Sequence, residues 1–171
     1  MNVRRTLLVV ALAIVAASAA AGSARAAHTY RDSISGHEYY FTSTEGRFAG
    51  NASGALPGAW NADVRHTPLC MLCHPTATIT GGSFSLATVI NGVLALVSGA
   101  FTGGTVQVTN TGVNCTNQTF DVEGVLAHVG PAPGGTGTGL FSSTLTHYRH
   151  RVFGICITYA ASVSGTLTLT F

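Results

Sequence analysis

The chain is poor in charge and contains no lysine. Only 8% of its 171 residues are charged, and all eight basic residues are arginines. Three of them, Arg4, Arg5 and Arg25, lie in the first 26 residues, which leaves five arginines against six acidic residues, a formal charge of −1 with histidine neutral. A chain with no basic stripe cannot neutralise many phosphates, so neither nucleic acid nor an anionic membrane surface is expected as a partner.

Sequence signatures of catalysis are also missing. The chain has no Gly-x-Ser-x-Gly elbow, no His-Glu-x-x-His helix and no phosphate-binding glycine loop. Asp121 and Glu123 lie two residues apart and could act as an acid and a base, but such a pair is more often the solvated face of a strand. The protein is therefore not expected to be an enzyme.

Residues 1–26 have the three parts of a secretory signal peptide. Arg4 and Arg5 form a positive start, Leu7–Ala21 is apolar, and Ala24-Arg25-Ala26 offers a cleavage site. The apolar stretch is short for a membrane-spanning helix. We predict that the mature protein begins near Ala27 and is secreted, to the periplasm or the extracellular space.

Residues 27–171 are predicted to form a single all-β domain, because glycine, threonine, serine and valine dominate them. Ser83–Ile90 alternates apolar and polar residues, Asn91-Gly92 suits a type I′ turn, and Val93–Phe101 is the expected return strand. Further strands are expected at 105–109, 115–129, 140–149 and 152–163, with a last one after Ser164-Gly165. Seven to nine antiparallel strands must close or stack to protect their edges. We predict a small antiparallel meander β-barrel, with a β-sandwich as the alternative.

Two long loops are predicted at Gly46–Pro75 and Gly130–Gly139, and a binding site is expected on them. Trp60 falls in the first loop, where a core position is favoured over an exposed anchor. The terminal Phe171 resembles the last residue of outer-membrane barrels. The chain lacks the two aromatic girdles of that class, so stable membrane insertion of the mature chain is not expected.

Cys70-Met71-Leu72-Cys73-His74 has the spacing of a c-type haem attachment site, in which two thiols bind the porphyrin and the imidazole binds iron. The only other methionine is Met1, so a second axial ligand would have to be a histidine: His66, His128, His147 or His150. Haem also needs an apolar wrapping that small cytochromes build from helices, and no such helices are predicted.

Four cysteines in an exported domain most simply form two disulfides, with three possible pairings. Cys115 and Cys156 lie on predicted strands far apart in sequence, which leaves Cys70 to pair with Cys73. A thioredoxin-like dithiol would need a helix that Pro75 disfavours. A zinc site at Cys70 and Cys73 would need two more ligands. We predict disulfides, and keep a haem or metal site at Cys70, Cys73 and His74 as the alternative.

The segment His147-Tyr148-Arg149-His150-Arg151 concentrates imidazole and guanidinium groups. In a strand, His147 and Arg149 share one face while Tyr148 and His150 share the other. A polar strand end is the simpler interpretation. A polar site for a metal or an anion would use His128, His147, Arg149 and His150.

The sequence thus favours a secreted, disulfide-stabilised β-barrel that needs no cofactor. Its expected role is to bind a small ligand or an extracellular surface partner without catalysis. The alternative is an exported protein that carries haem c or a metal at Cys70, Cys73 and His74.

Overall fold

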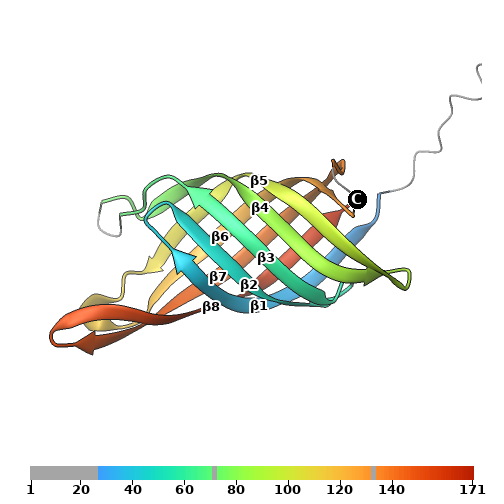
Figure 1. The fold of residues 1–171 in the computed structure, drawn as a ribbon. Helices are drawn as coiled ribbons and strands as arrows, with labels where there is room; N and C mark the ends of the chain where they lie inside the picture. The colour runs from blue at the N-terminus through green and yellow to red at the C-terminus, as the bar shows by residue number, and fades with distance from the viewer. Residues whose placement is uncertain (1–26, 71–72, 132–133) are drawn as a thin grey trace, which may run out of the picture.

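The computed structural model describes residues 27–70, 73–131 and 134–171, which form a closed barrel of eight antiparallel strands (Figure 1). Each strand pairs with the next in the chain, and the last pairs with the first. The strands are β1 (Thr29–Phe41), β2 (Glu45–Gly54), β3 (Gly58–His66), β4 (Thr76–Ile90), β5 (Val93–Asn110), β6 (Gln118–Gly130), β7 (Gly137–Val152) and β8 (Ile155–Thr170). The predicted all-β meander barrel is confirmed, and the predicted signal peptide lies outside the described residues.

The barrel has two different ends. The terminal end holds the start of β1, the end of β8, the connections at 55–57 and 91–92 and the described residues of 131–136. The disulfide end holds the connections at 42–44, 111–117 and 153–154 and the described residues of 67–75, and 111–117 includes the short 3-10 turn η1 (Val113–Cys115). Both disulfides, Cys70–Cys73 and Cys115–Cys156, lie at the disulfide end.

Alternation along each strand directs every second side chain into the barrel, where apolar residues fill the interior. Trp60 is only 1% exposed and packs edge-on against Phe141, with ring centroids 5.7 Å apart. Its indole N–H donates to the Ser35 carbonyl at 3.3 Å. The core position predicted for Trp60 is therefore confirmed.

The prediction of a long loop at Gly46–Pro75 is wrong, because β2 and β3 occupy most of this range. The four glycines of this range, Gly46, Gly50, Gly54 and Gly58, all lie within paired strands. A side chain at Gly50 would overlap the backbone of Ser35 on β1, and one at Gly58 would overlap the backbone of Ala87 on β4. These glycines allow neighbouring strands to approach closely, so they mark close approach and not a turn.

Two predicted breaks are also absent. Gly103-Gly104 lies inside the single strand β5, where Gly104 lies against the Glu123 backbone. Ser164-Gly165 lies inside the single strand β8, where Gly165 lies against the Ser142 backbone. Two of the turns that the structure does make have positive φ at both of their residues: Asn91-Gly92, with φ of 52° and 79°, and Phe153-Gly154, with φ of 48° and 83°. The Asn91-Gly92 turn was predicted correctly.

The strand expected to start at Cys115 begins instead at Gln118. Asn114 and Cys115 have φ of 56° and 70°, which is left-handed and cannot continue a strand ladder. The short turn η1 thus occupies the predicted start of the strand, and it places Cys115 beside the β7–β8 hairpin.

Candidate functional site

A pocket of about 360 Å³ opens into the barrel at the disulfide end. Its apolar wall comes from core side chains of β5, β6 and β7, namely Val106, Phe120 and Leu145. Polar groups of the rim, including Thr42 and Ser43, surround its entrance. The volume lies in the range of pockets that take small molecules.

The inner wall of this pocket carries a buried carboxyl–imidazole pair. His147 Nε2 lies 2.5 Å from Glu38 Oε2, and the two side chains are only 8% and 3% exposed. The imidazole lies between two phenyl rings, with centroids 4.8 Å from Phe41 and 5.0 Å from Phe120. Phe41 is half exposed and Phe120 is buried. The pair is therefore placed where the apolar interior meets the pocket.

Burial raises the pKa of the Glu38 carboxyl above its ordinary value. Desolvation is the largest cause, because it disfavours the charged form, and it outweighs the hydrogen bond and charge of His147 and the charge of His66, which act in the opposite sense. The Glu38 carboxyl thus stays protonated to higher pH than an exposed carboxyl would. The pair can hold a proton between the two side chains.

Glu38 reaches the interior through the alternation of β1, in which Ile34, Gly36 and Glu38 share the inward face. Gly46 on β2 leaves the space for the carboxyl. A Cβ at Gly46 would lie 2.6 Å from Glu38 Oε1 and 2.8 Å from Phe48 Cζ. The sequence analysis missed Glu38 because it assigned no strand before Ser83. The signal that could have found it is the alternation of a strand, which places Glu38 on the same face as the apolar Ile34.

Two other titratable side chains line the pocket. The Nδ1 atom of His66 lies 2.8 Å from the Thr67 carbonyl, so that nitrogen carries a proton and donates it. Glu45 accepts a hydrogen bond from Arg47 Nε at 2.6 Å. Within residues 27–70, 73–131 and 134–171, no three histidine, cysteine, aspartate or glutamate side chains lie close enough together to hold a metal ion.

The cysteines of the predicted haem motif are bonded to each other. Cys70 and Cys73 form a disulfide, and the backbones of Cys70 and His74 exchange hydrogen bonds of 2.8 and 3.1 Å. The His74 side chain is exposed. Thioether attachment of haem needs both thiols, so the form of the protein with this disulfide has no thiol for it. Met71 and Leu72, between the two cysteines, lie outside the described residues.

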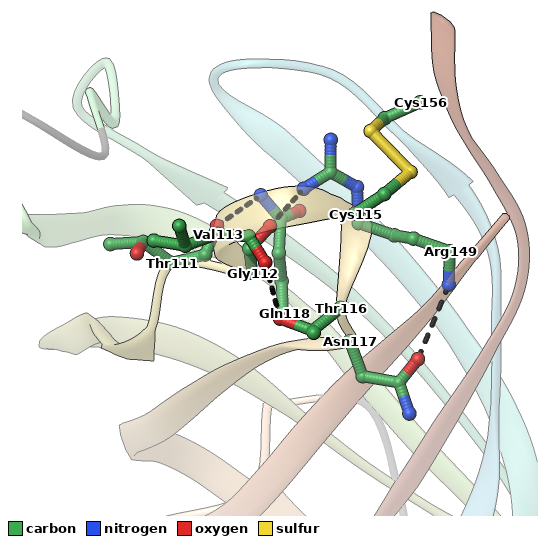
Figure 2. The surroundings of a disulfide bond; sticks show 9 residues. All are labelled: Thr111, Gly112, Val113, Cys115, Thr116, Asn117, Gln118, Arg149 and Cys156. Carbon is green, nitrogen blue, oxygen red and sulfur yellow. Dashed lines mark hydrogen bonds between the residues drawn. A yellow bond between two sulfur atoms is a disulfide. The ribbon is translucent and has the colours of Figure 1, made fainter. Parts of the chain in front are cut away.

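The second disulfide ties η1 to the β7–β8 hairpin (Figure 2). Beside it, Arg149 Nη1 donates to the Gly112 carbonyl at 3.1 Å, and the Arg149 backbone N–H donates to Asn117 Oδ1 at 3.4 Å. Both pairings predicted for the four cysteines are therefore found in the structure.

The four residues proposed as a polar site do not come together. His147 points into the barrel, whereas His150 is exposed on the hairpin and Arg149 is bound to the η1 segment. His128 lies near the far end of β6, about ten residues along the strands from the Gln118–His147 pairing, or roughly 30 Å. Only His147 of this group belongs to the pocket.

Asp121 and Glu123 lie on the outer face of β6, as expected for a solvated strand face. Asp121 Oδ1 accepts a hydrogen bond from the Thr144 hydroxyl at 3.1 Å, and Glu123 Oε1 accepts one from the Ser142 hydroxyl at 2.6 Å. These carboxylates form cross-strand contacts with β7 and face no pocket.

A larger hollow of about 730 Å³ lies at the terminal end. Its lining includes the glycine-rich end of β6 and the described residues that follow it, among them Gly130 and Gly135, together with Tyr30 and Phe171. No carboxylate or arginine is present among the described residues that line it. The disulfide-end pocket is the better candidate, because it combines an apolar wall with buried polar groups.

The chain matches no protein-family model, no curated protein and no solved structure. Among the described residues, no helix has the length and apolar character needed to cross a membrane. The case for a function therefore rests on the geometry of the pocket.

Proposed function

We propose that this protein is a secreted binding protein that takes a small, largely apolar ligand into the pocket at the disulfide end. The observation that carries the proposal is the buried pair of Glu38 and His147, which lies beside the apolar wall of the pocket. A buried ion pair is a weak contributor to stability, and apolar residues of similar size would often serve the fold as well. Its position suits recognition of a single hydrogen-bonding head on the ligand.

The surroundings of His147 support binding more than catalysis. Among the described residues, no serine, threonine or cysteine side chain is hydrogen-bonded to His147, so the pair has no activated nucleophile beside it. Both cysteine pairs are closed as disulfides. We propose that the protein acts without a cofactor and without covalent chemistry.

Two further features support a secreted protein that works in water. The disulfides indicate an oxidising compartment, extracellular or periplasmic, and they brace the loops around the pocket. Among the outward side chains of β1, Ser33, Ser35 and His37 are polar and Tyr39 is aromatic, and the apolar outer band of a barrel embedded in lipid would carry no such run of polar residues. A braced entrance favours a pocket that exists before the ligand arrives.

The proposal can be tested with the neutral fluorescent probe N-phenyl-1-naphthylamine and the oxidised mature protein. Ser43→Arg places a bulky charge at the pocket entrance and should weaken probe binding at least tenfold. Ser53→Arg is the matched control, because Ser53 is also exposed but lies on β2 at the terminal end. Equal binding by both variants would place the probe elsewhere and overturn the proposal.

The role of the Glu38–His147 pair is tested by comparing 1-naphthylmethylamine with 1-methylnaphthalene, which share the aromatic body but differ in the polar head. A hydrogen bond to a charged group contributes about 1.5 to 3 kcal/mol, so Glu38→Gln should weaken the amine roughly tenfold or more. The hydrocarbon should bind the variant and the wild type alike. An equal change in affinity for both compounds would show that the pair does not recognise the polar group of the ligand.

The absence of haem c is part of the proposal and has its own check. The intact mass of the exported protein should equal the mature chain with two disulfides. A covalent porphyrin mass and a Soret band would instead favour attachment at Cys70 and Cys73.

A further inference from the structure

The β7–β8 hairpin projects beyond the barrel at the disulfide end (Figure 1). β7 pairs with β6 only as far as His147, and β8 pairs with β1 only from Val163 onward, so the segment between them has no neighbouring strand. Four apolar or aromatic side chains of this projection are exposed: Phe153 at 101%, Ile155 at 68%, Ile157 at 44% and Tyr159 at 66%. They add nothing to the core of the barrel.

The residue at the hairpin tip is unusual for its turn. Phe153-Gly154 has φ of 48° and 83°, and Asn91-Gly92, at the β4–β5 turn, has nearly the same values of 52° and 79°. Asparagine is among the residues that adopt such a conformation readily, whereas a bulky side chain there is strained. The β7–β8 turn thus has phenylalanine at the position where the β4–β5 turn has asparagine. Neither the turn nor the core benefits from Phe153, which indicates a role in contact with something outside the molecule.

The projection is firmly mounted on the barrel. The Cys115–Cys156 disulfide and the two hydrogen bonds of Arg149 hold its base against the η1 segment (Figure 2). At the same base, the Tyr148 hydroxyl lies 3.1 Å from the Ser162 hydroxyl. The tip is therefore presented in a fixed position, which lowers the entropy lost on docking.

The charge of the hairpin points to the kind of partner. His150 and Arg151 are exposed next to the tip, and residues 148–159 contain no acidic residue. The near-neutral charge of the mature chain gave no reason to expect an anionic membrane partner, but the basic character of this hairpin is local. A convex tip with an exposed phenylalanine needs no matching cavity, and a basic flank complements anionic phosphates.

We propose that the hairpin docks the protein on an anionic lipid surface. Phe153 and Ile155 enter the boundary between headgroups and acyl chains, and Arg151 lies against the lipid phosphates. The contact is peripheral, with the hairpin alone entering the lipid. Docking would orient the disulfide end, with its pocket, toward the lipid. The inference does not depend on what the pocket binds.

The test measures sedimentation of the oxidised mature protein with vesicles of phosphatidylcholine and phosphatidylglycerol. Phe153→Asn should reduce the bound fraction, because it replaces the apolar side chain with the residue found in the equivalent turn at Asn91. Burying a phenylalanine side chain is worth roughly ten- to a hundredfold in partitioning, and a loss of that order is expected. Leu94→Asn is the control, because Leu94 is 77% exposed but lies on β5 beside the opposite turn.

Further measurements distinguish a lipid surface from other partners. Phe153→Trp should give a blue-shifted emission with anionic vesicles, above the constant signal of the buried Trp60. Binding should fall with added salt and with vesicles of phosphatidylcholine alone. Vesicle binding that Phe153→Asn leaves unchanged would overturn the proposal. So would a concentration-dependent dimer that Phe153→Asn dissociates in the absence of lipid, since the hairpin would then dock on a second copy.

Discussion

The two disulfides should contribute very unequally to stability, although both lie at the same end of the barrel. Cys115–Cys156 joins residues 41 apart in sequence, whereas Cys70–Cys73 joins residues only 3 apart. A crosslink stabilises mainly by restricting the unfolded chain, and it restricts more when it closes a longer loop. The comparison is clean because none of the four cysteines is fully buried, so replacement by serine leaves no buried hydroxyl.

The chain-entropy relation gives the expected sizes. Loss of Cys115–Cys156 in a Cys115→Ser, Cys156→Ser variant should lower the free energy of unfolding by about 4 kcal/mol at 25 °C. Loss of Cys70–Cys73 in the matching variant should lower it by about 2 kcal/mol. The hydrogen bonds of Arg149 to Gly112 and Asn117 remain in the first variant, so the native hairpin base should persist.

Urea unfolding of the wild type and both double variants measures the difference. With a dependence of about 2 kcal/mol per molar urea, the two midpoints should lie about 1 M apart. Equal losses in the two variants would refute the loop-length argument. An unchanged midpoint after loss of Cys115–Cys156 would show that the hydrogen bonds alone hold the hairpin base.

Three further predictions address the pocket and the hairpin. Because the pKa of Glu38 is raised in the folded protein, the native state binds more protons than the unfolded state above pH 4.5. The free energy of unfolding should therefore fall as pH rises through the folded pKa. Urea midpoints measured from pH 4 to 8 should fall less steeply for Glu38→Gln than for the wild type. Gly46→Ala should displace the Glu38 carboxyl and weaken 1-naphthylmethylamine binding, whereas Gly103→Ala, with no atom within 4 Å of the added Cβ, should leave fluorescence titrations unchanged. Phe153→Asn should raise the free energy of unfolding by about 1 kcal/mol, seen as a higher melting temperature, and a lower one would contradict the strain inferred at the tip.

Local sequence patterns predicted much of the fold. The alternation in Ser83–Ile90 and the Asn91-Gly92 turn gave one hairpin correctly, and the protection of strand edges favoured a closed barrel. Glycine was the main source of error. At Gly50, Gly104 and Gly165 the missing side chain lets a neighbouring strand approach, and a sequence alone does not distinguish that use from a turn.

The candidate site was less predictable than the fold. His147 was recognised as a polar residue, but the grouping with His128 and His150 was wrong, because neighbours in sequence point to opposite faces and His128 lies near the other end of the barrel. Glu38 and His147 meet across 109 positions of sequence, and only the closure of the barrel brings them within 2.5 Å. Such a contact has no local signal.

The sequence by itself determined the all-β class and the turn at Asn91-Gly92, and it favoured the core position of Trp60 and the cysteine pairing that the structure has. These follow from alternation, turn chemistry and side-chain size, which act over a few residues. The tertiary structure alone decided which strands continue past a glycine, where the pocket opens, and that a buried carboxyl meets an imidazole on its wall. Those features depend on the stagger of eight strands around a closed barrel, which is a property of the whole sheet.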